Sequence, residues 1–311
     1  MKKSLKIIAV TAILAVVMLF SLSGCTQTPY DKYLNTVWHS GQVEKAEYDY
    51  TYTLNEQELK GTLITKIFDA TNKSFKINQT QYTDCKKGNY YEYKLTCQND
   101  SHLDIVHAEV YFDAYAGQNF RPVHSYTYFD TKDGITQIEL KYSTKKVTAT
   151  VTTNGDVKTY TADLKSSLVY DNVELQAIAR TLNFNQKGTL AFFTPIYESN
   201  KIYPKQTAMG ALTEAPFNKK DENGKYISEV NNFSHLNGGN EFTAVGCLIQ
   251  SNEKPSGLPQ TLLVAKGKIE INGQLFNQPV IQITEGIEGK GLSVYTLQNM
   301  YLEEFNPTDF N

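Results

Sequence analysis

Between residues 48 and 163 the sequence repeats short strand-like segments separated by turn residues, a pattern that few folds can accommodate. Thr, Val, Tyr and Ile alternate in face along these segments, and turn residues recur about every 8 to 12 positions. Asn154-Gly155 tolerates the positive φ angles of a two-residue hairpin turn, and Lys132-Asp133-Gly134 marks another turn. Because hairpins join strands that are neighbours in the sequence, the pattern predicts an antiparallel β-meander.

One segment departs from this pattern and predicts a single amphipathic helix over about residues 172–183. The apolar side chains that recur there at helical spacing are Leu175, Ile178, Ala179 and Leu182. Asp171 is placed to cap the first turn, and Glu174 is placed to complete a capping box. Gln176 and Arg180 fall on the predicted polar face. A lone helix beside a meander must bury its apolar stripe, so we expect it to lie on the inner face of the sheet.

The N-terminus has the three parts of a secretory signal peptide: three lysines in the first six residues, an apolar run over residues 7–20, and small residues before Cys25. Those 14 residues would form a helix of about 21 Å, short of the roughly 30 Å that a permanent span must cross. Leu22-Ser23-Gly24-Cys25 resembles a bacterial lipobox, which implies cleavage before Cys25 and diacylglycerol on its sulfur. Two acyl chains anchor a protein stably. We therefore expect an exported lipoprotein on the outer face of the bacterial cell membrane; the alternative is a plain signal peptide with an accidental cysteine.

These patterns together predict a mainly β (α+β) fold: a large curved antiparallel β-meander packed on one amphipathic helix, with further antiparallel strands toward the C-terminus. We expect five segments: a signal peptide (1–24), a lipidated tether (25–40), the meander with its helix (41–194), an irregular loop region (195–240) and C-terminal strands that complete the same domain (241–311). Loops are predicted in the fourth segment from its prolines, Pro195, Pro204 and Pro216, and from the polar runs at residues 218–224 and 237–240. In the fifth, Asn272-Gly273 predicts another hairpin. Whether the chain forms one domain or two is left open by the sequence.

Charge and motifs exclude several functional classes. Without residues 1–24 the chain has 27 basic and 33 acidic residues, a formal net charge of −6, which argues against a nucleic-acid partner. No G-x-S-x-G, P-loop, H-E-x-x-H or C-x-x-C motif occurs. The sequence therefore predicts no catalytic residue, no metal site and no cofactor.

The cysteines and histidines are predicted to be structural. Cys247 lies in a segment that is apolar on both faces, which favours a buried, inert thiol. Cys85 and Cys97 flank a predicted turn, but a disulfide between them requires another register. The loose histidine cluster is His102, His107 and His124. In a hairpin turning near residue 117, the third of these would lie opposite Val110 rather than His107.

Charged residues outside the helix are also predicted to have no functional role. The segment Asp221-Glu222-Asn223-Gly224 has the composition of a calcium loop without its alternating ligands, so it predicts a solvated turn. Glu44, Glu47 and Asp49 cluster before the first strand and are expected to be surface charge.

Tyrosine is over-represented, with 21 residues against one Trp. Two groups of tyrosines that share strand faces are Tyr48, Tyr50 and Tyr52, and Tyr126 and Tyr128. An aromatic wall of this kind would suit a ligand that is partly apolar and partly polar, a lipid or a glycan, and Arg180 would hold its anionic group. Two alternatives stay open: tyrosines that cover the rim of the core, and a salt bridge from Arg180 to Asp113 or Asp163.

Two stretches carry a family resemblance. They are Val110-Tyr111-Phe112-Asp113 with residues 121–126, and residues 170–175 with residues 180–184. Together they resemble a family of exported bacterial proteins of unknown function, which implies the curved antiparallel sheet of LolA-type lipoprotein carriers. The similar region covers residues 109–184, with a weaker likeness over 267–284. A carrier that shuttles must be soluble, whereas this chain is expected to be tethered, so the resemblance implies a fold rather than a transfer reaction.

Three functions follow from these observations. The first is a membrane-anchored, non-enzymatic envelope lipoprotein that binds an amphiphilic envelope ligand between the sheet and the helix. The second is a structural or partner-binding envelope lipoprotein, and the third is an uncharacterised hydrolase. The predicted partners are the membrane, through lipid on Cys25, and a lipid or glycan ligand; the sequence identifies no protein partner.

Overall fold

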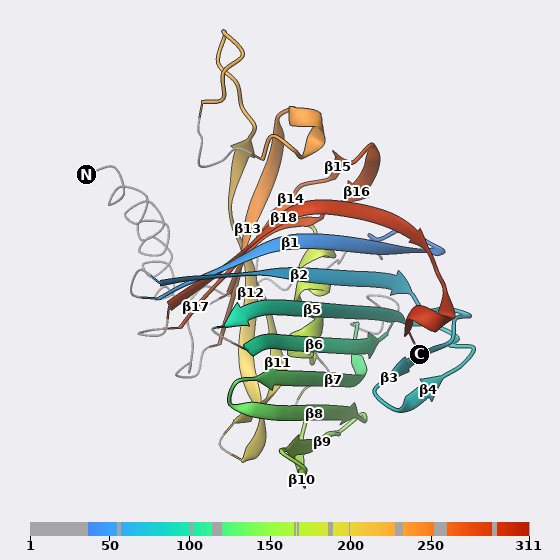
Figure 1. Ribbon diagram of the computed structural model, residues 1–311. Coiled ribbons are helices and arrows are strands. Elements are labelled where there is room, and N and C mark those ends of the chain that lie inside the picture. Colours follow the sequence, from blue (N-terminus) through green and yellow to red (C-terminus); the bar gives the residue numbers. More distant parts are fainter. Residues whose placement is uncertain are drawn as a thin grey trace.

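The computed structural model describes residues 37–54, 57–99, 102–113, 120–164, 166, 168–185, 189–198, 200–227, 233–251, 260–287 and 291–310 (Figure 1). The predicted leader, Cys25, most of the tether and the turn near residue 117 lie outside these ranges. Among the described residues, no helix is long and apolar enough to span a membrane.

Within the described chain, 14 strands form one antiparallel sheet in the order β10-β9-β8-β7-β6-β5-β2-β1-β18-β17-β14-β13-β12-β11. Their bounds are β1 Gln42–Leu54, β2 Gln57–Asp69, β5 Asn89–Asn99, β6 His102–Phe112, β7 Pro122–Thr131, β8 Gly134–Tyr142, β9 Lys146–Thr153, β10 Asp156–Asp163, β11 Thr189–Glu198, β12 Lys201–Phe217, β13 Phe242–Ser251, β14 Gln260–Ala265, β17 Val280–Ile287 and β18 Gly291–Glu304. Two hairpins stand apart from it: β3 Phe75–Ile77 with β4 Thr80–Tyr82, and β15 Lys268–Ile271 with β16 Gln274–Asn277. The mainly β prediction is confirmed.

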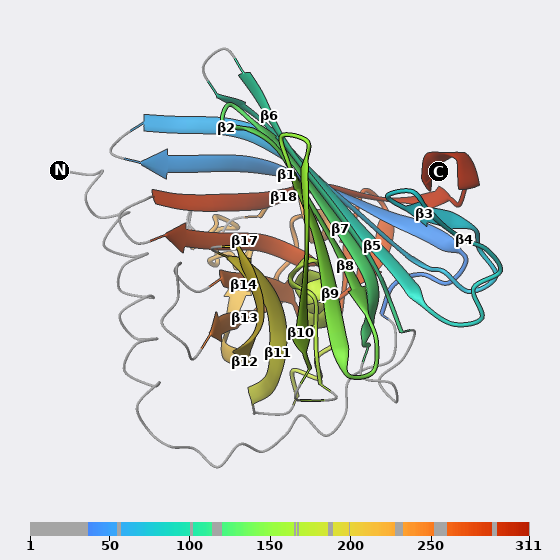
Figure 2. The same ribbon diagram turned by 90° about the horizontal axis from the view of Figure 1, so that it is seen from below.

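The path of the chain begins and ends at the centre of the sheet. The strands start at the centre with β1, run outward to β10, cross to the opposite edge at β11 and return to the centre, where β18 pairs with β1. The two edge strands, β10 and β11, are thus consecutive strands along the chain. They meet through side chains, with the rings of Tyr160 and Tyr197 5.5 Å apart. The result is a sheet rolled around its own helix (Figure 2).

Residues with positive φ set the predicted turns. Asn154 (φ 49°) and Gly155 (φ 92°) join β9 to β10, and the turn before Gly134 joins β7 to β8, as predicted. Asn272 and Gly273 also form a hairpin turn. However, this hairpin joins the short strands β15 and β16 rather than two long strands of the main sheet, because the chain breaks pairing after Ala265 and before Val280.

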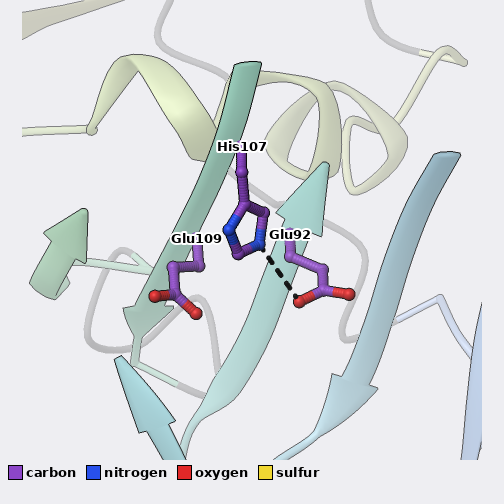
Figure 3. A group of neighbouring side chains, drawn as sticks. All are labelled: Glu92, His107 and Glu109. Atoms are coloured by element: carbon purple, nitrogen blue, oxygen red, sulfur yellow. Dashed lines mark ion pairs between the residues drawn. The ribbon is translucent and has the colours of Figure 1, made fainter. Parts of the chain in front are cut away.

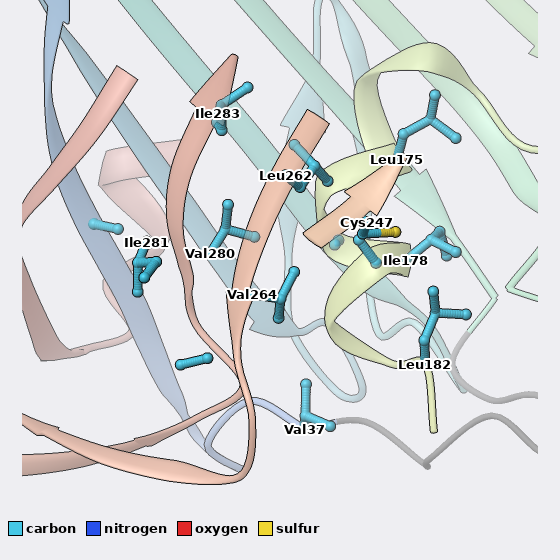
Figure 4. Packing of buried hydrophobic residues seen from close by; sticks show 14 of the residues in the cluster. Val37, Leu175, Ile178, Leu182, Cys247, Leu262, Val264, Val280, Ile281 and Ile283 are labelled. Carbon is cyan, nitrogen blue, oxygen red and sulfur yellow. The ribbon is translucent and has the colours of Figure 1, made fainter. Parts of the chain in front are cut away.

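The predicted helix is confirmed, although it ends at Arg180 rather than near residue 183, and it lies inside the curled sheet. It consists of a 3-10 turn, η2 (Asn172–Glu174), followed by α2 (Leu175–Arg180). The capping box is present: the Asp171 side chain accepts from the Val173 N–H, and the Asp171 N–H donates to Glu174 Oε1 at 2.7 Å. Leu175, Ile178 and Leu182 face strands β13, β14 and β17 in one core (Figure 4).

A second core covers part of the outer face of the sheet. It gathers the β3–β4 hairpin and the C-terminal 3-10 helix η4 (Pro307–Phe310) against strands β2 and β5. Phe68 stacks on Tyr90 at 4.9 Å between ring centroids and contacts Phe310 at 4.8 Å. The sheet is therefore covered on both faces in this region.

The sequence predicts an irregular region over residues 195–240. That prediction is wrong for the first half of the segment, which consists of the end of β11 and all of β12. The prolines were the misleading signal, because a proline cannot donate to a β-ladder. Pro195 and Pro204 face each other across β11 and β12, and β12 pairs with β13 only from Thr207 onward. Both prolines thus lie where no further neighbour needs their missing N–H. The exposed turn at Asp221 agrees with the prediction: its Oδ1 accepts from the Asn223 and Lys225 N–H groups.

The cysteines that the structure describes are free and buried. Cys247 is fully buried in the main core, and burial raises the pKa of its thiol to about 12, which keeps it protonated and unreactive. Cys85 precedes β5, whereas Cys97 is opposite Gly61 and Asp104 farther along that strand. The two do not form a disulfide.

Candidate functional site

The pairing register shows which side chains face the helix. Tyr48 is opposite Leu63, Leu63 is opposite Leu95, and directly paired residues share a face. Tyr48 and Leu63 belong to the core that contains the helix. The inner face therefore carries a row of tyrosines from three strands: Tyr48 and Tyr50 on β1, Tyr91 and Tyr93 on β5, and Tyr295 on β18.

A buried ion pair joins the helix to this inner face. Arg180 Nη2 lies 2.8 Å from Glu44 Oε2, and the Glu44 side chain is fully buried. The same arginine donates to the backbone oxygens of Asn277 and Gln278 at 2.9 and 3.1 Å. His39 completes the shell of Glu44 through its ring and its backbone N–H. Burial alone would raise the pKa of Glu44, but Arg180 and His39 outweigh it and hold that pKa below its usual range.

This pair corrects two predictions. Glu44 is not surface charge, and Arg180 is not on a solvated helix face; both are buried. The salt bridge expected of Arg180 exists, but its partner is Glu44 rather than Asp113 or Asp163. A strand residue 136 positions away in the sequence cannot be identified from local pattern.

A small cavity lies beside the ion pair, between the helix and the sheet. Its volume is about 20 Å³, and its polar lining consists of Glu44, Tyr48, Thr65, Tyr91, Gln176 and Arg180. The Tyr91 hydroxyl donates to Gln176 Oε1 at 2.6 Å. A volume of this size holds about one water molecule. The space under the helix is therefore too small for an amphiphilic ligand.

Farther along the same face, three inner side chains are less completely buried than those under the helix. Tyr50, Tyr93 and Leu95 pack against the main core but remain only partly buried. The rings of Tyr50 and Tyr295 lie 4.9 Å apart, and the Tyr295 hydroxyl donates to Glu285 Oε2 at 3.3 Å. Burial raises the pKa of Glu285. We call Tyr50, Tyr93, Tyr295, Glu285 and its amide partner Gln260 the interior tyrosine cluster.

The predicted aromatic wall is divided between the two faces of the sheet. Tyr126 and Tyr128 are opposite Glu109 and His107 on β6, which face away from the helix. Tyr126 packs on the second core, and the Tyr128 hydroxyl donates to Asp130 Oδ2 at 3.3 Å.

On the inner face the structure keeps the first group of tyrosines together. Tyr48 is buried, Tyr50 belongs to the interior tyrosine cluster, and Tyr52 is partly buried beside Gly291 at the strand end. Sequence reasoning missed Tyr91 and Tyr93, although their spacing of two residues on a strand was a usable signal.

The three histidines do not meet. His124 is opposite Tyr111, one residue from the predicted Val110, because a register shift separates Tyr111 from Phe112. His102 lies 3.3 Å from Asp130, and His107 lies 3.7 Å from Glu92. His124 Nε2 lies 2.9 Å from Glu139 Oε1, so each of the three histidines is paired with a different carboxylate.

The N-cap of the helix is a buried acidic network. Asp171 Oδ2 accepts from the hydroxyls of Ser125 and Tyr142, which ties the helix to β7 and β8. Glu174 is fully buried, and its Oε2 has no hydrogen-bond partner. Burial, reinforced by the neighbouring Asp171 carboxylate, raises the pKa of Glu174 well above its ordinary value. Burial thus favours the protonated form of the Glu174 carboxyl in the folded protein.

This protonation predicts a pH dependence of stability. The unfolded chain loses the Glu174 proton above about pH 4.3, whereas the folded chain keeps it up to its raised folded-state pKa. Between these two pKa values this group makes the free energy of unfolding fall by up to about 1.4 kcal/mol per pH unit. Glu174→Gln keeps the capping acceptor and has no proton to lose, so its advantage over the parent should grow from pH 5 to pH 7 and vanish near pH 4. Urea unfolding at a series of pH values measures this. Glu222→Gln, at an exposed turn, is the control and should parallel the parent; parallel curves for Glu174→Gln would contradict the assignment.

No family model and no curated protein matches the chain. It is similar to the crystal structure of a beta-barrel-like protein of the domain of unknown function DUF1849 from Brucella abortus, with 11% identity, a TM-score of 0.46, and coverage of 86% of this chain and 100% of that one. It is also similar to a DUF1329 family protein from Desulfovibrio piger ATCC 29098, with 9% identity, a TM-score of 0.25 and 91% of each chain covered.

Proposed function

We propose that this protein is an exported lipoprotein, anchored by lipid on Cys25, whose curled sheet binds an amphiphilic envelope molecule at the interior tyrosine cluster. The proposal of export and a lipid anchor rests on the lipobox-like residues Leu22, Ser23, Gly24 and Cys25 and on the lysine-rich, apolar segment before them. The binding role rests on the interior of the sheet. The resemblance to exported proteins with a carrier-like curved sheet agrees with both.

One observation carries the binding proposal: inward-facing rings of the sheet are left partly exposed. Tyr50, Tyr93 and Leu95 face the same interior as the fully buried Ile178 of the helix, yet the helix covers only part of that interior. A sheet that served only as a scaffold would gain stability by burying these side chains as well. Their partial exposure leaves apolar ring surface on the inner face that a ligand could cover, and aromatic side chains commonly line small-molecule sites.

The chemistry of the cluster suits a molecule with an apolar and a polar part. Tyrosine rings offer an apolar surface with a hydroxyl at one end. Burial of the ligand's apolar part would contribute about 25 cal/mol per Å². The Glu285 carboxyl, the Gln260 amide and the tyrosine hydroxyls would orient its polar part. Arg180 is occupied by Glu44 and does not take the anion-binding role that its sequence position suggested.

The test combines anchor and ligand in one preparation. The full chain and its Cys25→Ala form are produced in a bacterial host and separated by detergent phase partition. We expect the parent in the detergent phase and Cys25→Ala in the aqueous phase, because only the parent carries acyl chains. Native mass spectrometry of the aqueous Cys25→Ala protein should then show one recurring adduct of lipid or glycan mass.

Matched variants locate the adduct. Tyr93→Ala in the Cys25→Ala background should lose it, whereas Tyr128→Ala, a partly buried tyrosine on the outer face, should keep it. Equal partition of parent and Cys25→Ala would reject the anchor. A protein that is consistently empty, or an adduct indifferent to Tyr93, would reject the interior site and favour a structural or partner-binding role.

A further inference from the structure

The outer face of the sheet carries a group of side chains that the proposed function does not use. Glu92 on β5 is directly opposite Glu109 on β6, and His107 is two residues from Glu109 on the same strand and face. Figure 3 shows the imidazole between the two carboxylates. The ligand atoms of the three side chains all lie within 4.8 Å of one another.

These distances are close to those of a metal site. For three atoms no more than 4.8 Å apart, some point lies within 4.8/√3, about 2.8 Å, of each of them. Zinc binds histidine nitrogen and carboxylate oxygen at about 2.0 to 2.2 Å. The remaining gap is less than 1 Å per ligand, which small side-chain rotations can close.

The hydrogen bonds in this group do not fully satisfy its carboxylate oxygens, so a positive charge beside them would be stabilising. The Tyr90 hydroxyl lies 2.6 Å from Glu92 Oε2 and 2.9 Å from Glu109 Oε2. A phenol has a single proton and can donate it to one of these acceptors at a time. Glu109 is only 6% exposed, and its other oxygen accepts from the Asn78 N–H at 2.8 Å. The buried Glu109 carboxylate therefore has one oxygen, Oε2, whose hydrogen-bond donor is shared with Glu92.

The neighbouring cation, Lys66, does not supply positive charge to these oxygens. Lys66 Nζ lies 3.2 Å from Glu92 Oε1, the oxygen that faces away from His107. That contact neutralises one carboxylate and leaves Glu92 Oε2 directed at the imidazole. His107 is 34% exposed, so solvent reaches the group and a water molecule can complete the coordination.

We propose that Glu92, His107 and Glu109 bind a divalent transition metal ion, with Zn²⁺ as the best fit. One imidazole and two carboxylates, with water in the fourth position, match the ligands that zinc prefers, whereas Mg²⁺ requires an octahedron of oxygens. Tyr90 and the Asn78 N–H orient the two carboxylates from behind, in the manner of outer-shell partners of metal ligands.

Isothermal titration calorimetry tests the site. The full chain, kept in detergent micelles and freed of metal by EDTA and desalting, is titrated with ZnCl₂ and separately with MgCl₂. We expect one zinc per chain and no measurable heat from magnesium. His107→Ala should weaken zinc binding at least about 10-fold, the loss typical when a metal site is disturbed.

His102→Ala is the matched control, because His102 has a similar exposure of 38% and also lies beside two aspartates. This variant should bind zinc like the parent. Tyr90→Phe, which removes the shared hydroxyl, should weaken zinc binding without abolishing it. The proposal fails if the parent binds no zinc, or if His102→Ala loses binding while His107→Ala keeps it. Circular dichroism of each variant separates loss of the site from loss of the fold.

Discussion

Arg180→Met should lower the free energy of unfolding by about 3 to 5 kcal/mol, the usual cost of breaking a buried ion pair by removing one partner. The Glu44 side chain is fully buried and would lose its main counter-charge, so it must either stay charged beside His39 or take up a proton, and both states are unfavourable. The helix would also lose the two backbone contacts that Arg180 makes to Asn277 and Gln278. Urea unfolding followed by the fluorescence of Trp38, the only tryptophan and a buried one, measures the change.

Two further variants make this prediction specific. Arg121→Met removes the only other arginine, which donates to the backbone oxygens of Ser143 and Thr144 at an exposed position, and should cost about 1 kcal/mol or less. Combining Arg180→Met with Glu44→Leu removes both charges and should recover much of the loss, because apolar replacements of buried ion pairs are often neutral. If the two arginine variants lowered the free energy of unfolding equally, the prediction that Glu44 depends on Arg180 would be wrong.

Ile178→Asp should be destabilising by about 4 to 5 kcal/mol, because it places an unpaired charge in the main core or expels the helix from it. Ile178 is fully buried and lies among residues of β13, β14 and β17 (Figure 4). Thermal unfolding by circular dichroism gives the change. Asn172→Asp is the control, since it adds the same charge to the same helical segment at an exposed position. A change under about 0.5 kcal/mol for Ile178→Asp would mean that the helix faces solvent.

Local signals were enough to predict the elements that local forces determine. The helix has its own cap, back-bond and apolar stripe within a few residues of Asp171, and each of these appears in the structure. The turn at Asn154-Gly155 likewise needs only two residues with positive φ. Where a strand depends on its neighbours, local signals fail: Pro195 and Pro204 suggest loops until their place on β11 and β12 is known.

The candidate site depended on information that no short segment contains. Whether Tyr126 shares a face with Tyr48 depends on the register of every strand between them. The alternation of each strand was readable, but the pairing that relates one strand to the next was not. For the same reason the sequence grouped His107 with other histidines, whereas the register places Glu92 beside it.

The pairing of β1 with β18 has a consequence for how the chain is made. Tyr50 pairs with Tyr295, so the central seam of the sheet cannot form until nearly the whole chain has been synthesised. Until then β1 has one neighbour, β2, and one edge of unpaired N–H and C=O groups. Such an edge is a template for pairing with other chains, and contacts between residues so distant in sequence form slowly. Until β18 has been made, that edge of β1 is therefore open to pairing with other chains.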